Sequence, residues 1–215
     1  MELAAAKLFG EQTRVVGSGR TDAGVHAIAQ VAHFDADKIL PPKNIIGGLN
    51  AYLPREIRVT AAQETRSDFD ARKDAHKKTY MYLMYGGDIL PVLNDRATHL
   101  DFEPNIERMT ATAKDFIGRH DFSTFMTTGS SAKTFTRTVF DARLETEGRF
   151  IKFYITADGF LYNMVRIITA QLIKAGRGEN IDVPSLIEKR DRKYAPDVAP
   201  ACGLYLYSVD YGDKE

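Results

Sequence analysis

Two neighbouring stretches, RTVFDARLE at Arg137 to Glu145 and FIKFYITA at Phe150 to Ala157, decide the fold that this sequence predicts. In both stretches apolar and polar residues alternate, and β-branched and aromatic side chains are frequent. Such alternation is typical of β-strands, because successive side chains of an extended chain point to opposite faces. The two strands are the starting point from which the neighbouring elements are assigned.

The segments on either side of these strands supply the other elements. Helical spacing of apolar residues appears before them at Ile106, Met109, Ala113 and Phe116, and after them from Phe160 to Lys174. Further strands are predicted at Lys78 to Tyr85 and Leu204 to Tyr211, and a short extra helix at Val183 to Lys189. The order strand, helix, strand, strand, helix, strand is the split βαβ arrangement of ferredoxin-like domains.

The first third of the chain repeats this order without its opening strand. Helices are predicted at Leu3 to Phe9 and Ile45 to Tyr52, and strands at Thr13 to Gly17, Ala29 to Phe34 and Ile57 to Glu64. Because a sheet without one strand leaves an unpaired edge, we expect a further strand before Met1. The prediction is an α+β protein with two ferredoxin-like halves, 1–75 and 76–215, which share a broad, mainly antiparallel sheet with a cleft between them.

Composition limits the function without identifying it. Twenty-nine basic residues balance twenty-nine acidic ones, so the chain lacks the global positive field that favours nucleic-acid binding. The most apolar long stretch, 160–175, contains Asn163, Arg166, Gln171 and Lys174, and no apolar signal segment opens the chain. The single cysteine, Cys202, forms neither an internal disulfide nor a cysteine-rich zinc site. A cytoplasmic protein without a membrane span is expected.

Glycine, charge and small residues are concentrated in GSGRTDAGVH at Gly17 to His26. A dinucleotide-binding fingerprint would need a third glycine where Asp22 stands, and a phosphate-binding P-loop would need lysine and a hydroxyl residue after Gly24. Two interpretations stay open. Asp22 caps a backbone amide in a tight loop, or the loop presents the Asp22 carboxylate for chemistry, with Arg20 and His26 beside it.

The words GRTDAGVHA at Gly19 to Ala27 closely resemble the signature of the TruA family of tRNA pseudouridine synthases. Further similarity covers the whole chain: LNAYLP at Leu49 to Pro54, FDAR at Phe69 to Arg72, KTYMY at Lys78 to Tyr82, HDF at His120 to Phe122, FLYNMVRII at Phe160 to Ile168 and GLYL at Gly203 to Leu206. Two departures stand out, because family members ordinarily begin before this Met1 and Asp70 stands where histidine is common.

The resemblance implies an isomerase without cofactor or metal that acts on uridines in the anticodon stem-loop of tRNA. It implies a homodimer with the tRNA lying across both subunits. Asp22 matches the catalytic aspartate, Tyr80 the tyrosine that stacks near the target uracil, and Arg166 the arginine that pairs with the aspartate. The alternative is a catalytically idle RNA-binding remnant. The histidines show no metal-ligand spacing, which agrees with the absence of a metal site.

Candidate RNA contacts surround these three residues. Arg20 and His26 hold the loop or meet RNA phosphate, Phe160 lines the pocket of Tyr80, and Lys133 lies in a Ser/Thr/Gly-rich loop at Met126 to Thr136. Basic clusters occur at Arg72, Lys73, Lys77 and Lys78 and at Lys189, Arg190, Arg192 and Lys193. For both clusters a solvated surface is the favoured interpretation. Arg72 and Lys78 are kept as RNA-binding candidates.

Overall fold

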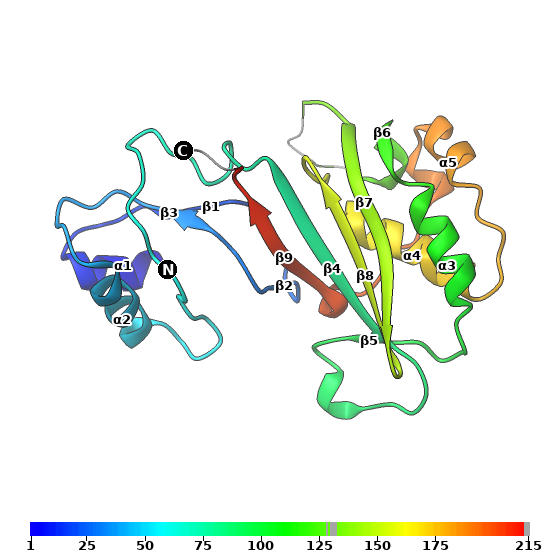
Figure 1. The fold of residues 1–215 in the computed structure, drawn as a ribbon, viewed down its shortest axis with the longest axis horizontal. Helices are drawn as coiled ribbons and strands as arrows, with labels where there is room; N and C mark the ends of the chain where they lie inside the picture. The colour runs from blue at the N-terminus through cyan, green and yellow to red at the C-terminus, as the bar shows by residue number, and fades with distance from the viewer. Residues whose placement is uncertain (128, 130–132, 213–215) are drawn as a thin grey trace. The chain divides into compact units, whose positions relative to one another are not determined.

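The computed structural model describes residues 1–127, 129 and 133–212 and has an α+β fold (Figure 1). The chain forms two compact units, a smaller one of residues 1–20 and 31–74 and a larger one of residues 21–30 and 75–215. The division falls inside the glycine-rich loop. Asp22 and His26 therefore belong to the larger unit, together with Tyr80 and Arg166.

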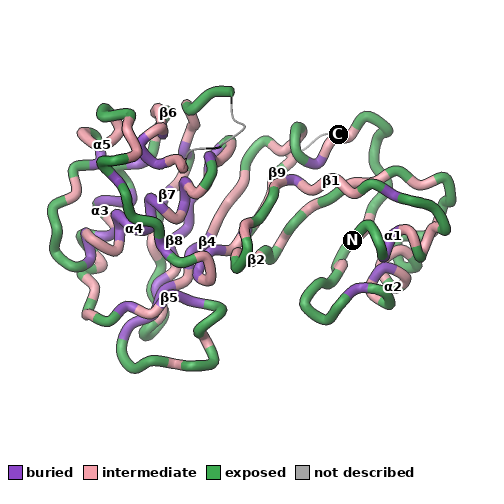
Figure 2. The backbone as a smooth tube through the Cα atoms, turned by 180° about the vertical axis from the view of Figure 1, so that it is seen from behind, coloured by how far each residue is buried: buried purple, intermediate pink, exposed green. Residues whose placement is uncertain are grey.

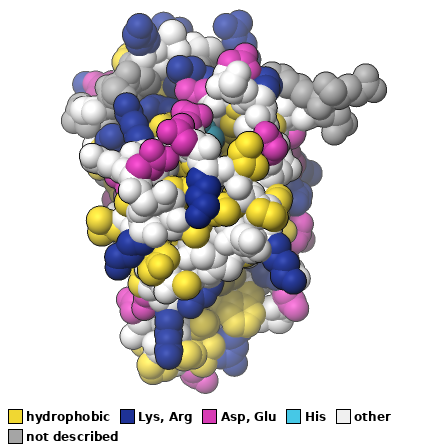
Figure 3. All heavy atoms as spheres, turned by 90° about the vertical axis from the view of Figure 1, so that its left-hand side faces the viewer, with side chains coloured by type: hydrophobic (Ala, Val, Ile, Leu, Met, Phe, Trp, Pro, Cys, Tyr) yellow, Lys and Arg dark blue, Asp and Glu magenta, His cyan; other side chains and the backbone are white. Residues whose placement is uncertain are grey.

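The smaller unit contains two helices and a short two-stranded sheet. Helices α1 (Glu2–Phe9) and α2 (Pro42–Tyr52) pack around Ala4, Ala5, Leu49 and Leu53, whereas β1 (Val16–Gly17) and β3 (Ala32–His33) pair antiparallel with each other. Other apolar side chains are exposed, Leu3 by 83% and Ile39 by 89%. On the face seen in Figure 3, hydrophobic side chains lie between interspersed basic and acidic ones.

The predicted strand at Ile57 to Glu64 is wrong, because the structure assigns no strand there. The reason is a pair of side-chain hydrogen bonds. Asn50 Nδ2 donates to the Val59 carbonyl oxygen and Val59 N–H donates to Asn50 Oδ1, each at 2.8 Å. The backbone groups of Val59 are thus satisfied by a helix side chain instead of a neighbouring strand.

The larger unit contains a seven-stranded sheet. In spatial order the path consists of β2 (His26–Ala27), β9 (Leu204–Asp210), β4 (Lys77–Tyr85), β8 (Phe150–Ala157), β7 (Thr136–Glu147) and β6 (Gly118–Asp121), while β5 (Thr98–His99) pairs with β4. The neighbours in the series β9, β4, β8, β7 are all antiparallel. This strand order, with helices after β4 and β8, confirms the split βαβ arrangement for this part of the chain.

Helices cover one face of this sheet (Figure 1). They are α3 (Ile106–Lys114) and α4 (Met164–Gly176), followed by α5 (Val183–Lys189). The main core lies between α3, α4 and the sheet, where Figure 2 shows most of the buried backbone, and it includes Phe116, Phe122, Phe125, Phe153, Ile155 and Ile168. Helix α4 begins at Met164 rather than at Phe160, because Asn163 adopts a left-handed conformation with φ of 61°. Arg166 consequently lies in the first helical turn.

The α+β class with a large, mainly antiparallel sheet is confirmed. The first 75 residues contribute β2 to the seven-stranded sheet, whereas β1 and β3 form their own pair. The cleft between two halves, and the boundary at residue 75, stay predictions. None of the helices in the described ranges combines the length and the apolar character needed to cross a membrane.

Candidate active site

Asp22 lies in the loop that leads into β2. Its carbonyl oxygen accepts a hydrogen bond from Val25 N–H at 3.0 Å, and Gly24 between them has a φ of 82°, a left-handed conformation that favours glycine. The Asp22 side chain is half-buried. Both interpretations from the sequence, a capping carboxylate and a presented one, stay predictions.

Strand β2 and His26 anchor this loop to the sheet. His26 pairs with Tyr205 and Ala27 with Leu206 in a parallel ladder. The His26 ring stacks on the Tyr205 ring with centroids 4.8 Å apart, and its Nε2 lies 2.8 Å from the Asp95 carbonyl oxygen, to which it donates. With its ring stacked and one nitrogen engaged, His26 is placed to hold the loop.

The sheet register brings Tyr80 to the loop. Leu206 of β9 is the pairing partner of both Ala27 on β2 and Tyr80 on β4. Only β9 therefore lies between the end of β2 and Tyr80. Burial raises the pKa of the Tyr80 hydroxyl, and the negative charge of Asp22 raises that pKa further. The phenol therefore keeps its proton at neutral pH and can donate it toward a reacting group.

Phe160 forms the wall beside this tyrosine. The two rings meet edge to face, with centroids 5.0 Å apart and an interplanar angle of 84°. Neighbouring Tyr82 belongs to the core instead, because it is fully buried and its hydroxyl lies 2.6 Å from Thr98 Oγ1 and donates to the Pro200 carbonyl oxygen at 2.8 Å. Of these two tyrosines on β4, Tyr82 packs in the core, whereas Tyr80 remains the candidate for the site.

The Arg166 guanidinium is held by two hydrogen bonds. Its Nε donates to the Ala199 carbonyl oxygen at 2.7 Å and its Nη1 to Asn163 Oδ1 at 2.9 Å. Its positive charge acts to lower the pKa of Tyr82, although burial raises that pKa on balance. Among the ion pairs of the described residues none joins Arg166 to Asp22. Their pairing stays a prediction.

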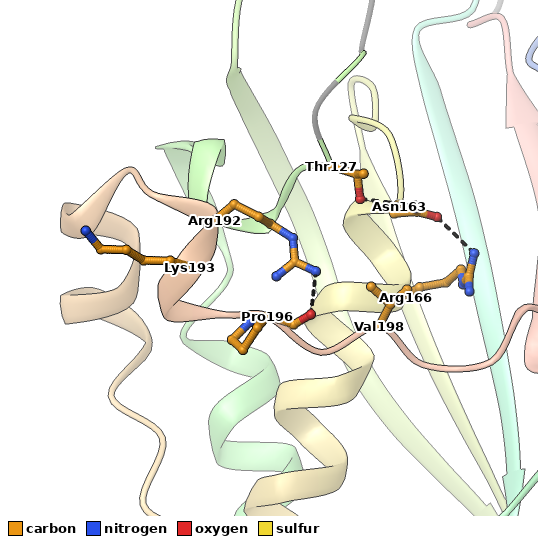
Figure 4. Close-up of a pocket in the computed structure, with 7 residues that line it drawn as sticks. All are labelled: Thr127, Asn163, Arg166, Arg192, Lys193, Pro196 and Val198. Atoms are coloured by element: carbon orange, nitrogen blue, oxygen red, sulfur yellow. Dashed lines mark hydrogen bonds between the residues drawn. The ribbon is translucent and has the colours of Figure 1, made fainter.

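A hollow of about 470 Å³ lies beside Arg166 (Figure 4). Its polar lining consists of Thr127, Asn163, Arg166, Arg192 and Lys193, and Pro196 and Val198 complete it. A short chain of hydrogen bonds runs along it, since Asn163 Nδ2 donates to Thr127 Oγ1 at 3.1 Å and Arg166 donates to Asn163. The described residues that line this hollow include three cations and no carboxylate.

The remaining candidates from the sequence are dispersed. Arg20 and Arg72 are exposed on the smaller unit, whereas Lys78 on β4 is half-buried and Lys133 is exposed, both on the larger unit. The structure brings Phe160 to Tyr80 and His26 to the Asp22 loop. Which of the four cations meets RNA stays a prediction.

Asp70, where the family commonly has histidine, organises a turn. Its Oδ1 accepts from Arg72 N–H at 2.9 Å and from Lys73 N–H at 3.0 Å, while its Oδ2 pairs with Lys73 Nζ at 3.0 Å. These hydrogen bonds to backbone and side chain lower the pKa of Asp70 to about 2. The carboxylate at this position has a local structural role.

Sequence reasoning missed Asn163 and did not separate Arg192 from its neighbours. The apolar run from Phe160 suggested an uninterrupted helix, so Asn163 carried no signal of its own. Arg192 belonged to a basic cluster in which Arg190 has a side chain 69% exposed, whereas the Arg192 guanidinium is partly buried. A charge cluster does not reveal which member faces inward.

The site combines a half-buried loop carboxylate, a buried tyrosine whose pKa that carboxylate raises, and a split βαβ scaffold. A family model described as tRNA pseudouridine synthase matches residues 1–73 and 112–212. The chain is 44% identical over 214 residues to "tRNA pseudouridine synthase A" of Acetivibrio thermocellus, covering 98% of this chain and 88% of that protein. It is 41% identical, with the same coverage, to the protein of that name from Caldicellulosiruptor saccharolyticus.

"tRNA pseudouridine synthase A 2" of Clostridium perfringens is 40% identical, again over 98% of this chain and 88% of the relative. The chain belongs to the tRNA pseudouridine synthase family, a family of isomerases. The resemblance carried by the signature around Asp22 is thereby confirmed.

Proposed function

We propose that this protein converts uridine to pseudouridine in the anticodon stem-loop of tRNA, with the Asp22 carboxylate as the catalytic group and without a cofactor. The main structural support for the proposal is the electrostatic effect of Asp22 on Tyr80. The loop anchored by β2 presents Asp22 beside the protonated hydroxyl of Tyr80, whose pKa the aspartate raises. Family membership supplies the reaction class.

The reaction breaks the bond between ribose and a base nitrogen, rotates the uracil and rejoins the ribose to a base carbon. A carboxylate assists by adding to the uracil ring as a nucleophile, or by acting at the ribose. Both routes require a flipped nucleotide, because the reacting atoms are inaccessible within a stacked helix. Tyr80 supports either route, since its ring offers a stacking surface and its hydroxyl a proton.

Arg166 is the proposed partner of the aspartate when substrate is bound. A guanidinium can bind a carboxylate with two parallel hydrogen bonds, and its charge opposes the rise in carboxylate pKa that a closed, dry pocket would cause. In the structure Nε and Nη1 are engaged by Ala199 and Asn163, so the Nη2 group is the one directed to this role.

The finer assignments follow from the family resemblance. The protein acts in the cytoplasm as a homodimer, with one tRNA lying across both subunits. The lone Cys202 supports a reducing compartment. The affinity for RNA comes from phosphate contacts of Arg20, Arg72, Lys78 and Lys133. The chain as a whole has no net charge that would attract RNA.

The experiment locates pseudouridine along a tRNA after incubation with the protein. Purified protein is incubated with an unmodified tRNA transcript, and pseudouridine is located by chemical labelling and primer extension. A matched transcript with cytidine in place of the anticodon-arm uridines is the control. The proposal expects label in the anticodon arm of the first transcript and none in that of the second. A folded protein that binds tRNA but forms no pseudouridine would support the idle-remnant alternative instead.

A further inference from the structure

The hollow beside Arg166 contains an unusual cation. Arg192 extends from a short 3-10 helix (Arg192–Tyr194) toward α4, whereas Lys193 points away from it and pairs with Asp191 Oδ2 at 2.9 Å (Figure 4). The Nη2 of Arg192 donates to the Pro196 carbonyl oxygen at 2.9 Å and lies 3.5 Å from that of Asp197. Arg192 thus fixes a loop with one edge of its guanidinium.

The other edge of the guanidinium has no acceptor. Nη1 of Arg192 is buried, and no described residue accepts a hydrogen bond from it. A buried charged donor left without an acceptor costs free energy. Burial also lowers the pKa of Arg192, and the nearby charge of Asp197 only partly opposes this effect. The guanidinium that lines the hollow is therefore only partly compensated within the described chain, and its positive charge can attract an anion placed in the hollow.

The position of the hollow indicates what kind of anion binds there. Arg166 lines the same hollow, and its guanidinium is directed toward β4, the strand of Tyr80 (Figure 4). The hollow, of about 470 Å³, is open to solvent, so it can admit a phosphate that remains part of a strand. Asn163 and Thr127 provide polar atoms along the wall between the two arginines. A nucleotide strand that enters at Arg192 would reach the catalytic residues past Arg166.

We propose that Arg192 binds one backbone phosphodiester of the substrate RNA in this hollow and so positions the strand beside the flipped uridine. The inference rests on the proposed function and names a binding residue for it. Free inorganic phosphate shares the chemistry but lacks the sugar, so it is expected to bind far more weakly.

The first test compares two charge-removing variants. Arg192→Gln removes the guanidinium in the hollow, and Arg190→Gln removes the neighbouring exposed charge as the matched control. For binding of a stem-loop RNA, Arg192→Gln is expected to raise Kd about tenfold and to reduce the slope of log Kd against log salt by about 1. Arg190→Gln is expected to leave both quantities near the wild-type values.

The second test first maps the contacted linkage with the wild-type protein and then repeats the measurement with a variant of Arg192. Stem-loops are made with a single uncharged methylphosphonate linkage at each position in turn, on a 2′-O-methyl nucleotide, beside phosphodiester controls. One linkage close to the target uridine should weaken binding about tenfold. In Arg192→Gln, or in Arg192→Lys if the glutamine variant does not fold, that penalty should be reduced or lost.

The inference is overturned if Arg192→Gln binds RNA with the wild-type Kd and salt slope, or if Arg190→Gln lowers the slope equally. It is also overturned if no single linkage shows a penalty that depends on Arg192. All of these results leave pseudouridine formation by the wild-type protein untouched. A wild-type protein that forms no pseudouridine would instead refute the proposed function. When inorganic phosphate is added to the protein–stem-loop complex at a concentration equal to that of the RNA, it should not displace the stem-loop.

Discussion

The negative charge of Asp22 raises the pKa of the Tyr80 hydroxyl, which burial raises already. Sheet register produces this relationship, because Leu206 of β9 pairs with Ala27 on one side and with Tyr80 on the other. A short parallel strand after the glycine-rich loop is thus enough to bring a loop carboxylate to a tyrosine that is distant in sequence. In the proposed function, this pair forms the catalytic site.

The first prediction concerns the Tyr80 hydroxyl. Tyr80→Phe keeps the ring and its edge-to-face contact with Phe160 but removes the proton donor. We expect the turnover rate kcat to fall about 10²-fold, with little change in KM, because general acid–base groups contribute on this scale. Steady-state kinetics on a tRNA transcript measure both. An unchanged kcat would limit Tyr80 to stacking.

Tyr82→Phe is the matched control for this substitution. Its hydroxyl is buried and bonded to Thr98 and Pro200, so its removal should lower the free energy of unfolding by about 1–3 kcal/mol. The activity of the folded fraction should remain near that of wild type. Denaturant unfolding beside the kinetic assay separates the two tyrosines.

The second prediction concerns the geometry of Arg166. Arg166→Lys keeps the positive charge but cannot maintain two directed hydrogen bonds while offering a further pair to Asp22. We expect kcat/KM to fall about 10²-fold, as for a misplaced catalytic group. Single-turnover rates with saturating enzyme provide the measurement. Full activity in the lysine variant would contradict the assigned role.

The third prediction is a pH dependence of stability. The pKa of Asp70 is lowered to about 2 in the folded protein from its ordinary value of 3.8. A lowered folded-state pKa means that the charged group stabilises the fold above pH 3.8, and that this contribution is lost as pH falls toward 2. Asp70→Asn should therefore be less stable than wild type at pH 7, with a difference that shrinks below pH 3.8.

Urea unfolding of both proteins at pH 7, 4 and 3 tests this expectation. Asp68→Asn, which removes a more exposed carboxylate from the same segment, is the control, with its side chain 81% exposed. A stability difference that is constant across this pH range would show that the Asp70 charge is not responsible.

Much of the larger unit was predictable because its signals are local. The alternation in β7 and β8 and the helical spacing in α3 agree with the structure, as does the split βαβ order. Other features depend on contacts distant in the sequence. Val59 is bonded to the Asn50 side chain, and the two-residue strand β2 exists because β9 lies beside it.

The candidate site shows the same limit. The glycine-rich segment drew attention to Asp22, and the family resemblance to Tyr80 and Arg166. Neither indicated that Asn163 would adopt a positive φ and delay the start of α4, or that Arg192 would bury one nitrogen while Arg190 stays exposed. These properties follow from tertiary packing, which periodicity does not encode.

The most direct measurement is pseudouridine formation by Asp22→Asn under single-turnover conditions, with Asp88→Asn, an exposed carboxylate of the same unit, as control. We expect the Asp22 variant to fold and to bind tRNA with the wild-type Kd, while its rate falls by about 10⁴-fold or more. The control should retain the wild-type rate. An Asp22→Asn protein that forms pseudouridine at the wild-type rate would show that Asp22 is not the catalytic group.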